Sequence, residues 1–225
     1  MAATNQSTSV EQDSTVDAPE IPSVASEPSS TQQFWAFQPP KFEPVQFIQK
    51  KDREQILSLS VLEASAVAHE PLAKGGNHWT FYLTIIPNTL EADAWRLMQL
   101  DCTPSGTPAG DGGDGSKANI VLSLLEDRQY SRAQCKCRLT TRQPLKVSDF
   151  VDTIIEHGRE KYDFNNMGLG CKKWVADQMD LFLKVGIITD QDEVKHARSE
   201  MMFQWEKFEH IDDHSSWVST GSYYQ

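Results

Sequence analysis

The clearest structural signal in the chain is the segment NHWTFYLTII, residues 77–86. Large apolar side chains occupy every second position, at Trp79, Phe81, Leu83 and Ile85. The positions between them are polar, and His78 is the first of these. A period of two residues indicates a β-strand with one buried face and one polar face. The segment therefore predicts a sheet, with His78 on the polar side of one strand.

A second strand is predicted over residues 95–102, after a connection at 87–94 whose proline and asparagine suit a hairpin. Antiparallel pairing of the two strands brings His78 close to residues 101–103. Asp101 is then within reach of the imidazole. Two other interpretations stay open: the histidine has no catalytic task, or Asp101 caps the following loop through its own backbone.

The remaining segments add strands and helices to this hairpin. Further strands are predicted over 120–125, 133–140 and 55–67, although the composition of the last also suits a helix. Residues 103–119 are predicted to form a loop. Apolar stripes and capping residues indicate three helices: one capped by Ser148, one over 171–185, and one from the capping box Thr189–Asp192 through Trp205 and Phe208. The expected fold is α+β, an antiparallel sheet of four or more strands packed with about three helices.

The composition divides the chain into three parts. Residues 1–44 are expected to form a disordered acidic tail with an aromatic, proline-rich end, because residues 1–33 contain no lysine, arginine or aromatic side chain and few large apolar groups. Residues 45–209 are expected to form the folded domain. Residues 210–225 are expected to be an irregular tail.

The charge, the hydropathy and the cysteines narrow the class of protein. A net charge of −11 provides no electrostatic footprint for a phosphate backbone, so nucleic-acid binding is not expected. The chain shows neither an apolar run of about 18–20 residues for a membrane span nor an N-terminal secretory signal, so the expected location is the cytoplasm or the nucleus. The four cysteines form no CxxC pair and are expected to be free thiols.

No metal or cofactor site is expected. The run DGGDG, residues 111–115, lacks the third ligand position and the closing glutamate of a calcium loop, and a flexible turn is preferred. Cys135 and Cys137 share one face of a predicted strand. The pair alone does not complete a zinc site, so a buried apolar role is expected for both.

Cys171 is the strongest candidate for chemistry. It follows the glycine-rich run NMGLG, residues 166–170, and opens the helix predicted over 171–185. A thiol in the first turn of a helix lies among unpaired backbone N–H groups, which stabilise a thiolate. Amides near Gly170 and Cys171 would also stabilise an oxyanion. The alternative is an ordinary buried cysteine, because Cys171 shares a helix face with apolar residues such as Trp174.

A nucleophilic thiol needs a base, usually an imidazole, and a third group that orients the base. Of the six histidines, only His78 begins a predicted strand beside a carboxylate. The others, His69 among them, lie in predicted loops or tails, or outside the apolar stripes of predicted helices. We therefore predict that His78 is the base for Cys171 and that Asp101 orients its imidazole.

The order of these parts resembles the circularly permuted papain-like folds, in which a histidine in an early strand precedes a cysteine at the start of a later helix. These folds include the permuted NlpC-type peptidases, the lecithin:retinol acyltransferase type and the PPPDE deubiquitinating-type peptidases. Over about residues 70–190 the chain also resembles a fungal domain family of unknown function. The shared motifs are Asn77-His-Trp79, Asp101-x-Thr-Pro-Ser105, Gly158-Arg159, Lys161-Tyr162-x-Phe-Asn165 and Gly170-Cys-x-x-Trp174.

The resemblance implies a cysteine-dependent hydrolase or acyl/peptidyl transferase, in which Cys171 is the nucleophile, His78 the base and Asp101 the orienting residue. It implies an unknown peptide or acyl substrate and no cofactor. Several relatives have asparagine directly before the cysteine, where this chain has Gly170. Such scaffolds also host binding proteins without turnover, so a non-catalytic protein-interaction or small-molecule-binding module is the alternative.

Overall fold

A computed structural model of the protein describes residues 41–73, 75–86, 96–110, 113–125, 130, 132–211 and 221–225. The part of the predicted N-terminal tail up to residue 40 and the hairpin connection at 87–94 lie outside the described residues. Residues 41–225 form one compact unit.

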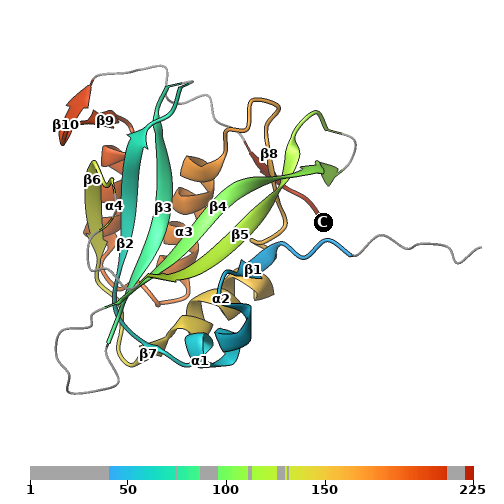
Figure 1. Ribbon diagram of the computed structural model, residues 1–225. Coiled ribbons are helices and arrows are strands. Elements are labelled where there is room, and N and C mark those ends of the chain that lie inside the picture. Colours follow the sequence, from blue (N-terminus) through green and yellow to red (C-terminus); the bar gives the residue numbers. More distant parts are fainter. Residues whose placement is uncertain are drawn as a thin grey trace, which may run out of the picture. The chain divides into compact units, whose positions relative to one another are not determined.

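A large, mainly antiparallel sheet forms the centre of this unit (Figure 1). Its strands are β1 (Val45–Phe47), β2 (Ser60–Pro71), β3 (Asn77–Ile85), β4 (Arg96–Pro108), β5 (Ser116–Leu125), β6 (Cys135–Leu139), β7 (Leu145–Lys146), β8 (Tyr162–Phe164) and β11 (Ser222–Tyr223). Their order is β11-β8-β5-β4-β3-β2-β6, with β1 beside β5 in parallel and β7 beside β2. A separate hairpin consists of β9 (Gln204–Glu206) and β10 (Glu209–Ile211). The prediction of an α+β fold with four or more antiparallel strands is confirmed.

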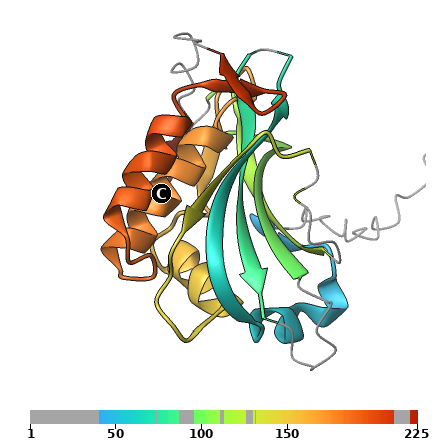
Figure 2. The same cartoon turned by 90° about the vertical axis from the view of Figure 1, so that its left-hand side faces the viewer.

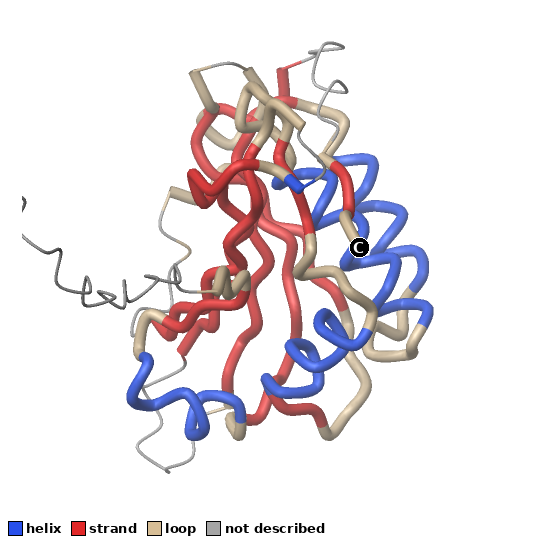
Figure 3. The backbone as a smooth tube through the Cα atoms, turned by 90° about the vertical axis from the view of Figure 1, so that its right-hand side faces the viewer, coloured by secondary structure: helices blue, strands red, loops and turns tan. Residues whose placement is uncertain are grey.

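Helices cover the apolar face of the sheet. They are η1 (Lys50–Asp52), α1 (Arg53–Leu57), α2 (Val147–Glu156), α3 (Cys171–Lys184) and α4 (Gln191–Glu200). Helices α2, α3 and α4 lie on the same side of the sheet (Figure 2), and the view from the opposite side shows the same arrangement (Figure 3). None of the helices in the described residues is long and apolar enough to cross a membrane.

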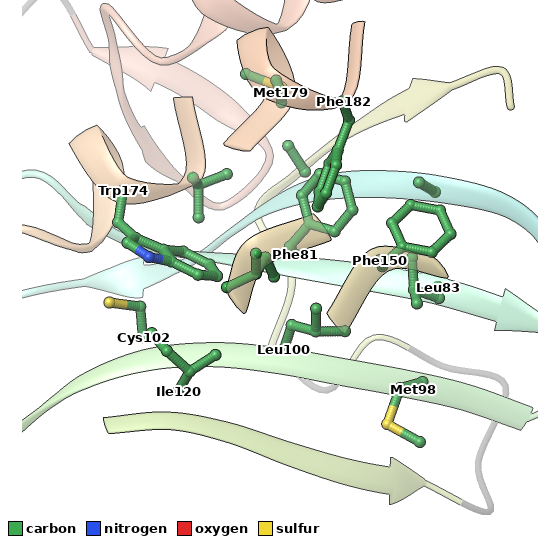
Figure 4. Packing of buried hydrophobic residues seen from close by; sticks show 14 of the residues in the cluster. Phe81, Leu83, Met98, Leu100, Cys102, Ile120, Phe150, Trp174, Met179 and Phe182 are labelled. Atoms are coloured by element: carbon green, nitrogen blue, oxygen red, sulfur yellow. The ribbon is translucent and has the colours of Figure 1, made fainter. Parts of the chain in front are cut away.

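The core lies between these helices and the alternating apolar residues of the strands. Phe81 on β3 packs against Phe182 of α3, with 5.5 Å between the ring centroids, and Phe182 meets Phe150 of α2 edge-on at 5.1 Å (Figure 4). Such tilted aromatic pairs add to the free energy gained by burial. Trp174 of α3 is fully buried near Cys102 in the same cluster. The core thus fixes α3 across the middle of the sheet.

The opposite face of β3 is covered as well, which differs from the half-exposed strand that the alternation predicts. Thr80 and Tyr82 are buried, and Tyr82 packs with Val67 and Leu97 in a second, smaller cluster. Tyr130 meets the Tyr82 ring edge-on at 5.0 Å. Alternation identified the two faces of the strand correctly. It could not show that residues from other segments, Tyr130 among them, cover the polar face.

The predicted loop at 103–119 is wrong over much of its length. Strand β4 continues to Pro108 and β5 begins at Ser116, with an irregularity between Pro104 and Pro108. Proline lacks the N–H that a strand with neighbours on both sides needs. Among the described residues, the pairing of β4 with β3 stops at Leu100, and the later part of β4 pairs with β5 alone. Two prolines are tolerated there.

The helix boundaries differ from prediction at three places. Lys146, not Ser148, is the N-cap of α2, and its N–H donates to the Asp149 carboxylate at 2.7 Å. Asp190 caps α4 by accepting from the N–H groups of Asp192 and Glu193. Helix α4 ends at Glu200, so the continuation expected through residues 205–208 is β9 and a turn instead. The segment 55–67 contains both of its alternatives, because α1 ends at Leu57 and β2 begins at Ser60.

The residues after Glu209 also differ from the irregular tail that was expected. Strand β10 covers 209–211 and β11 covers 222–223, while residues 212–220 lie outside the described residues. Strand β11 pairs with β8, and Tyr223 packs on Tyr162 with 4.9 Å between ring centroids. A strand of two residues is too short to show a periodic pattern in the sequence. Packing on the core, and not a local pattern, therefore produces β11.

Candidate active site

The candidate site begins where strands β3 and β4 part. Their pairing runs from Ile85 opposite Arg96 to Phe81 opposite Leu100. On the outer sides, β2 still pairs with β3 as far as Asn77, and β5 still pairs with β4 beyond Leu100. The two strands therefore diverge beyond this point (Figure 1). His78 on β3 and Asp101 on β4 flank the beginning of this split.

The split brings the predicted base and its orienting group together. His78 Nε2 lies 2.6 Å from Asp101 Oδ1, and the Thr80 hydroxyl lies 3.5 Å from the same oxygen. The side chains of His78 and Asp101 are 26% and 21% exposed, so both are shielded but reachable from solvent. Because the Nε2–H donates to the carboxylate, Nδ1 is the nitrogen left for a second partner.

Cys171 is the first residue of α3, as the sequence predicts, and α3 contacts both β3 and β4. The loop before it is held by Asn165, whose side-chain oxygen accepts hydrogen bonds from the N–H groups of Met167 (3.0 Å) and Leu169 (2.8 Å). Turns closed by an asparagine side chain in this way replace backbone turns. The loop therefore delivers Cys171 to the sheet in a defined position, with 6% of the residue exposed.

Gly170 occupies a place where only glycine fits. A Cβ atom there would lie 2.9 Å from the Phe164 ring and 3.1 Å from the Tyr162 ring. The Tyr162 hydroxyl donates to the Gly170 carbonyl at 3.0 Å, and the Trp174 N–H donates to the same carbonyl. No side chain caps the helix at this residue. The backbone N–H groups of the first turn are thus available to a negative charge, on the sulfur or on a bound oxyanion.

The electrostatics of the cluster favour a charged imidazole. Burial by itself would lower the pKa of His78, but hydrogen bonds with Asp101 and Cys171 and the charges of both groups outweigh it, raising the pKa from 6.5 to about 10. At neutral pH the imidazole is therefore protonated beside the Asp101 carboxylate. Burial, and then the charges of Cys171 and Asp101, raise the pKa of Cys102, so that thiol stays neutral.

The structure thus brings His78, Asp101 and Cys171 into one cluster, with Gly170 at the helix entry. Their catalytic roles stay a prediction. Sequence reasoning missed His69, which lies in β2 and not in a loop. Its Nε2 lies 3.2 Å from the Tyr82 hydroxyl, and its ring centroid lies 6.0 Å from that of His78. The alternation of polar residues along β2 could have indicated that His69 lies in a strand, but the register shift after Ala68 interrupts that pattern.

A second residue that sequence reasoning missed is Asn77, directly before His78. Its buried side chain donates to the carbonyls of His69 (2.6 Å) and Trp205 (2.7 Å) and accepts from the Trp205 N–H (2.7 Å). One amide group therefore joins the end of β2, the start of β3 and strand β9 beside the candidate base. Nothing in the sequence pairs Asn77 with a residue so far along the chain.

A cavity of about 360 Å³ lies elsewhere, between residues 109–110 and 113–115, β8 and β11. Its lining includes Gly110, Asp163 and Tyr224 but neither His78 nor Cys171. The first two residues of the DGGDG run, 111 and 112, lie outside the described residues. Within the part of the chain that the structure describes, no group of three or more His, Cys, Asp or Glu side chains is arranged to hold a metal ion.

The fold and the cluster define an α+β domain with a thiol, an imidazole and a carboxylate at the mouth of a split sheet. A family model described as "Domain of unknown function (DUF7770)" matches residues 64–224, from β2 to β11. The chain belongs to this family. No curated protein and no solved structure matches the chain.

Proposed function

We propose that the protein is a cysteine-dependent hydrolase or acyl/peptidyl transferase with Cys171 as its nucleophile. The observation that supports this most strongly is the contact of His78 Nε2 with Asp101 at 2.6 Å, in an imidazole whose pKa, despite burial, is raised first by Asp101 and then by Cys171. Carboxylate, imidazole and thiol in this order are the components of nucleophilic catalysis, in which the base is itself oriented by a third group.

Each group has a defined part in the proposed reaction. Asp101 holds the imidazole through Nε2, and in the resting pair Nδ1 already holds the proton given up by Cys171. The sulfur attacks the substrate carbonyl, and N–H groups at Gly170 and Cys171 stabilise the oxyanion. The imidazolium then protonates the leaving group, which departs and leaves a thioester on Cys171. Water, or the amine or hydroxyl of an acceptor, then gives a proton to His78 and attacks the thioester carbonyl. The C–S bond breaks, the acyl product leaves, and the Cys171 sulfur is regenerated beside the protonated imidazole.

The order of the elements supports a relation to the permuted papain-like folds, which we include in the proposal. Strand β3 with His78 precedes helix α3 with Cys171 in the chain, and strands β4–β8 and helix α2 lie between them. Chemistry that depends on a thiol also suits a reducing compartment, the cytoplasm or the nucleus. All four cysteines are free, in agreement with such a location.

Acylation by an activated ester tests the proposal without knowledge of the substrate. We expect p-nitrophenyl acetate to add one acetyl group to Cys171, detected by intact mass and peptide mapping, and His78→Ala to slow this step by about 10²–10⁴-fold. His196→Ala, at an exposed ion pair on α4, is the matched control and should leave the rate unchanged. Equal acylation rates in the protein and in His78→Ala would remove the base from the mechanism.

A non-catalytic binding module on the same scaffold is the second candidate, and the 6% exposure of Cys171 favours it. Iodoacetamide separates the two. An activated Cys171 is alkylated well below the range near pH 8.5 in which ordinary thiols ionise, and His78→Ala abolishes that reactivity. In a binding module, Cys171 reacts only at high pH or after unfolding, and the histidine substitution changes nothing.

A further inference from the structure

Two cysteines outside the candidate active site lie side by side on strand β6. The Sγ atoms of Cys135 and Cys137 are 3.9 Å apart. They lie two positions apart in the strand, so they point to the same face. Strand β6 forms one edge of the sheet, and α4 packs against it. Cys137 is buried and Cys135 is half-buried, so the pair is reached from solvent through Cys135.

The separation of the sulfurs suits an ion between them better than a direct bond. Two thiolates about 2.3 Å from one tetrahedral ion lie roughly 3.8 Å apart. A disulfide instead needs Cβ atoms about 3.5–4.5 Å apart. On a regular strand, the Cβ atoms of residues two positions apart are separated by about 6.5 Å. A disulfide would therefore require β6 to buckle, whereas a bridging ion requires almost no movement.

The charges around the pair also favour a cation. The Cys135 and Cys137 thiols are within hydrogen-bonding distance of each other, and either can be the donor. The Glu200 carboxylate of α4 adds negative charge near both sulfurs. The two thiols therefore lie in a negative environment, where a cation that displaces their protons is stabilised.

We propose that Cys135 and Cys137 form a dithiolate site for a single thiophilic ion, held by both sulfurs beside the Glu200 carboxylate. Among the described residues no third His, Cys, Asp or Glu completes a metal-binding group. The site therefore suits soft ions that two protein thiolates satisfy, with water or a small molecule at any further position. It is independent of the function proposed for Cys171.

Phenylarsine oxide tests the geometry, since its arsenic bonds to two thiols at once. Two As–S bonds form while both thiol protons leave with the oxo oxygen as water, without oxidation or reduction. In a Cys171→Ser background, we expect intact mass to show one arsenical per chain that survives excess monothiol. Cys135→Ser and Cys137→Ser each abolish it, and Cys102→Ser retains it. Retention in either β6 variant, or no arsenical on the parent protein, overturns the proposal.

Cadmium binding gives a second, reversible measurement. Cd²⁺ displaces two protons, and its thiolate charge-transfer absorbance reports the complex. We expect at least tenfold weaker binding in Cys135→Ser and about threefold weaker binding in Glu200→Gln. Circular dichroism verifies that each variant is folded. If the buried Cys137→Ser unfolds, Cys135→Ser and Cys135→Ala decide the outcome, and unchanged cadmium affinity in both contradicts a two-sulfur site.

Discussion

His78 has the most informative environment of any single side chain in this protein. Its pKa is about 10 in the fold against 6.5 ordinarily. A histidine whose pKa is raised by folding contributes stability that is complete below pH 6.5 and is lost as the pH rises through 10. Its contribution is therefore largest in mildly acidic solution, where a buried neutral histidine would instead destabilise the fold.

Replacement of His78 by glutamine tests this charge. We expect the difference in unfolding free energy between the parent protein and His78→Gln to be greatest below pH 6.5 and to decline continuously toward pH 10. One unit of pKa shift corresponds to about 1.4 kcal/mol, so urea denaturation at stepped pH resolves the trend. His196→Gln serves as an exposed control. A difference that does not vary over this range would exclude an imidazolium beside Asp101.

Gly170 permits a second prediction about one position. A methyl group there would lie 2.9 Å from the Phe164 ring, closer than real Cβ contacts, and 3.1 Å from the Tyr162 ring, tighter than most of them. We expect Gly170→Ala to destabilise the protein by about 1–3 kcal/mol, because overpacking displaces rings that are themselves buried. Gly113→Ala is the control, since its nearest neighbour would be at an ordinary 3.5 Å. Thermal unfolding compares the two, and equal stability would show that the α3 entry yields easily.

Among the elements, the hairpin β9–β10 depends most on one contact. The Asn77 side chain makes three hydrogen bonds, two of them to the backbone of Trp205. Its removal leaves buried backbone groups without a partner, which costs about 1–3 kcal/mol. We expect Asn77→Ala to lose that amount in urea denaturation and to accelerate hydrogen exchange at the Trp205 amide. Gln204→Ala, which removes only the bond to the Gly76 N–H, should have a smaller effect.

The elements also show what the sequence can reveal about the site. Strand β3 and helix α3 were predictable because apolar residues recur in them with a clear period. Antiparallel register then placed Asp101 near His78, and the contact of 2.6 Å agrees with that arithmetic. The point at which β3 and β4 separate was not predictable. Alternation shows which face a residue occupies, but not how far two strands remain paired.

Packing that crosses long distances in sequence was also invisible. The extension of β4 past Leu100 contains prolines and glycine that ordinarily indicate a loop, and only the missing neighbour strand explains them. Strand β11 and the contact between Asn77 and Trp205 carry no periodic signal at all. Local patterns therefore identified the main elements, while the walls of the site depended on tertiary contacts.

At the level of the whole molecule, the two ends of the chain should respond differently to truncation. Residues 41–225 form one compact unit, and the sequence of residues 1–33 is too poor in apolar groups to build a core. We expect removal of residues 1–40 to leave the midpoint of thermal unfolding unchanged. Removal of 221–225 should destabilise the domain by about 2–3 kcal/mol, less than the loss of a fully buried aromatic side chain.

The reason for this difference lies in the contacts of Tyr223. It packs on Tyr162, accepts a hydrogen bond from Gln178 at 3.2 Å, and lies under the Arg159 guanidinium. Tyr223→Ala is expected to reproduce most of the effect of the longer truncation, and Gln225→Ala none of it. Scanning calorimetry of the four proteins compares them directly. Equal midpoints for the two truncations would show that β11 contributes nothing to the domain.

The contact of Gly221 with Tyr162 has a consequence for biosynthesis. A Cβ at Gly221 would overlap the Tyr162 hydroxyl, and that hydroxyl supports the carbonyl of Gly170. Because the ribosome synthesises the chain from its N-terminus, helix α3 with Cys171 emerges before Gly221 can pack on Tyr162. In the nascent protein Tyr162 and the Gly170 carbonyl that it holds therefore lack this support until β11 has been synthesised.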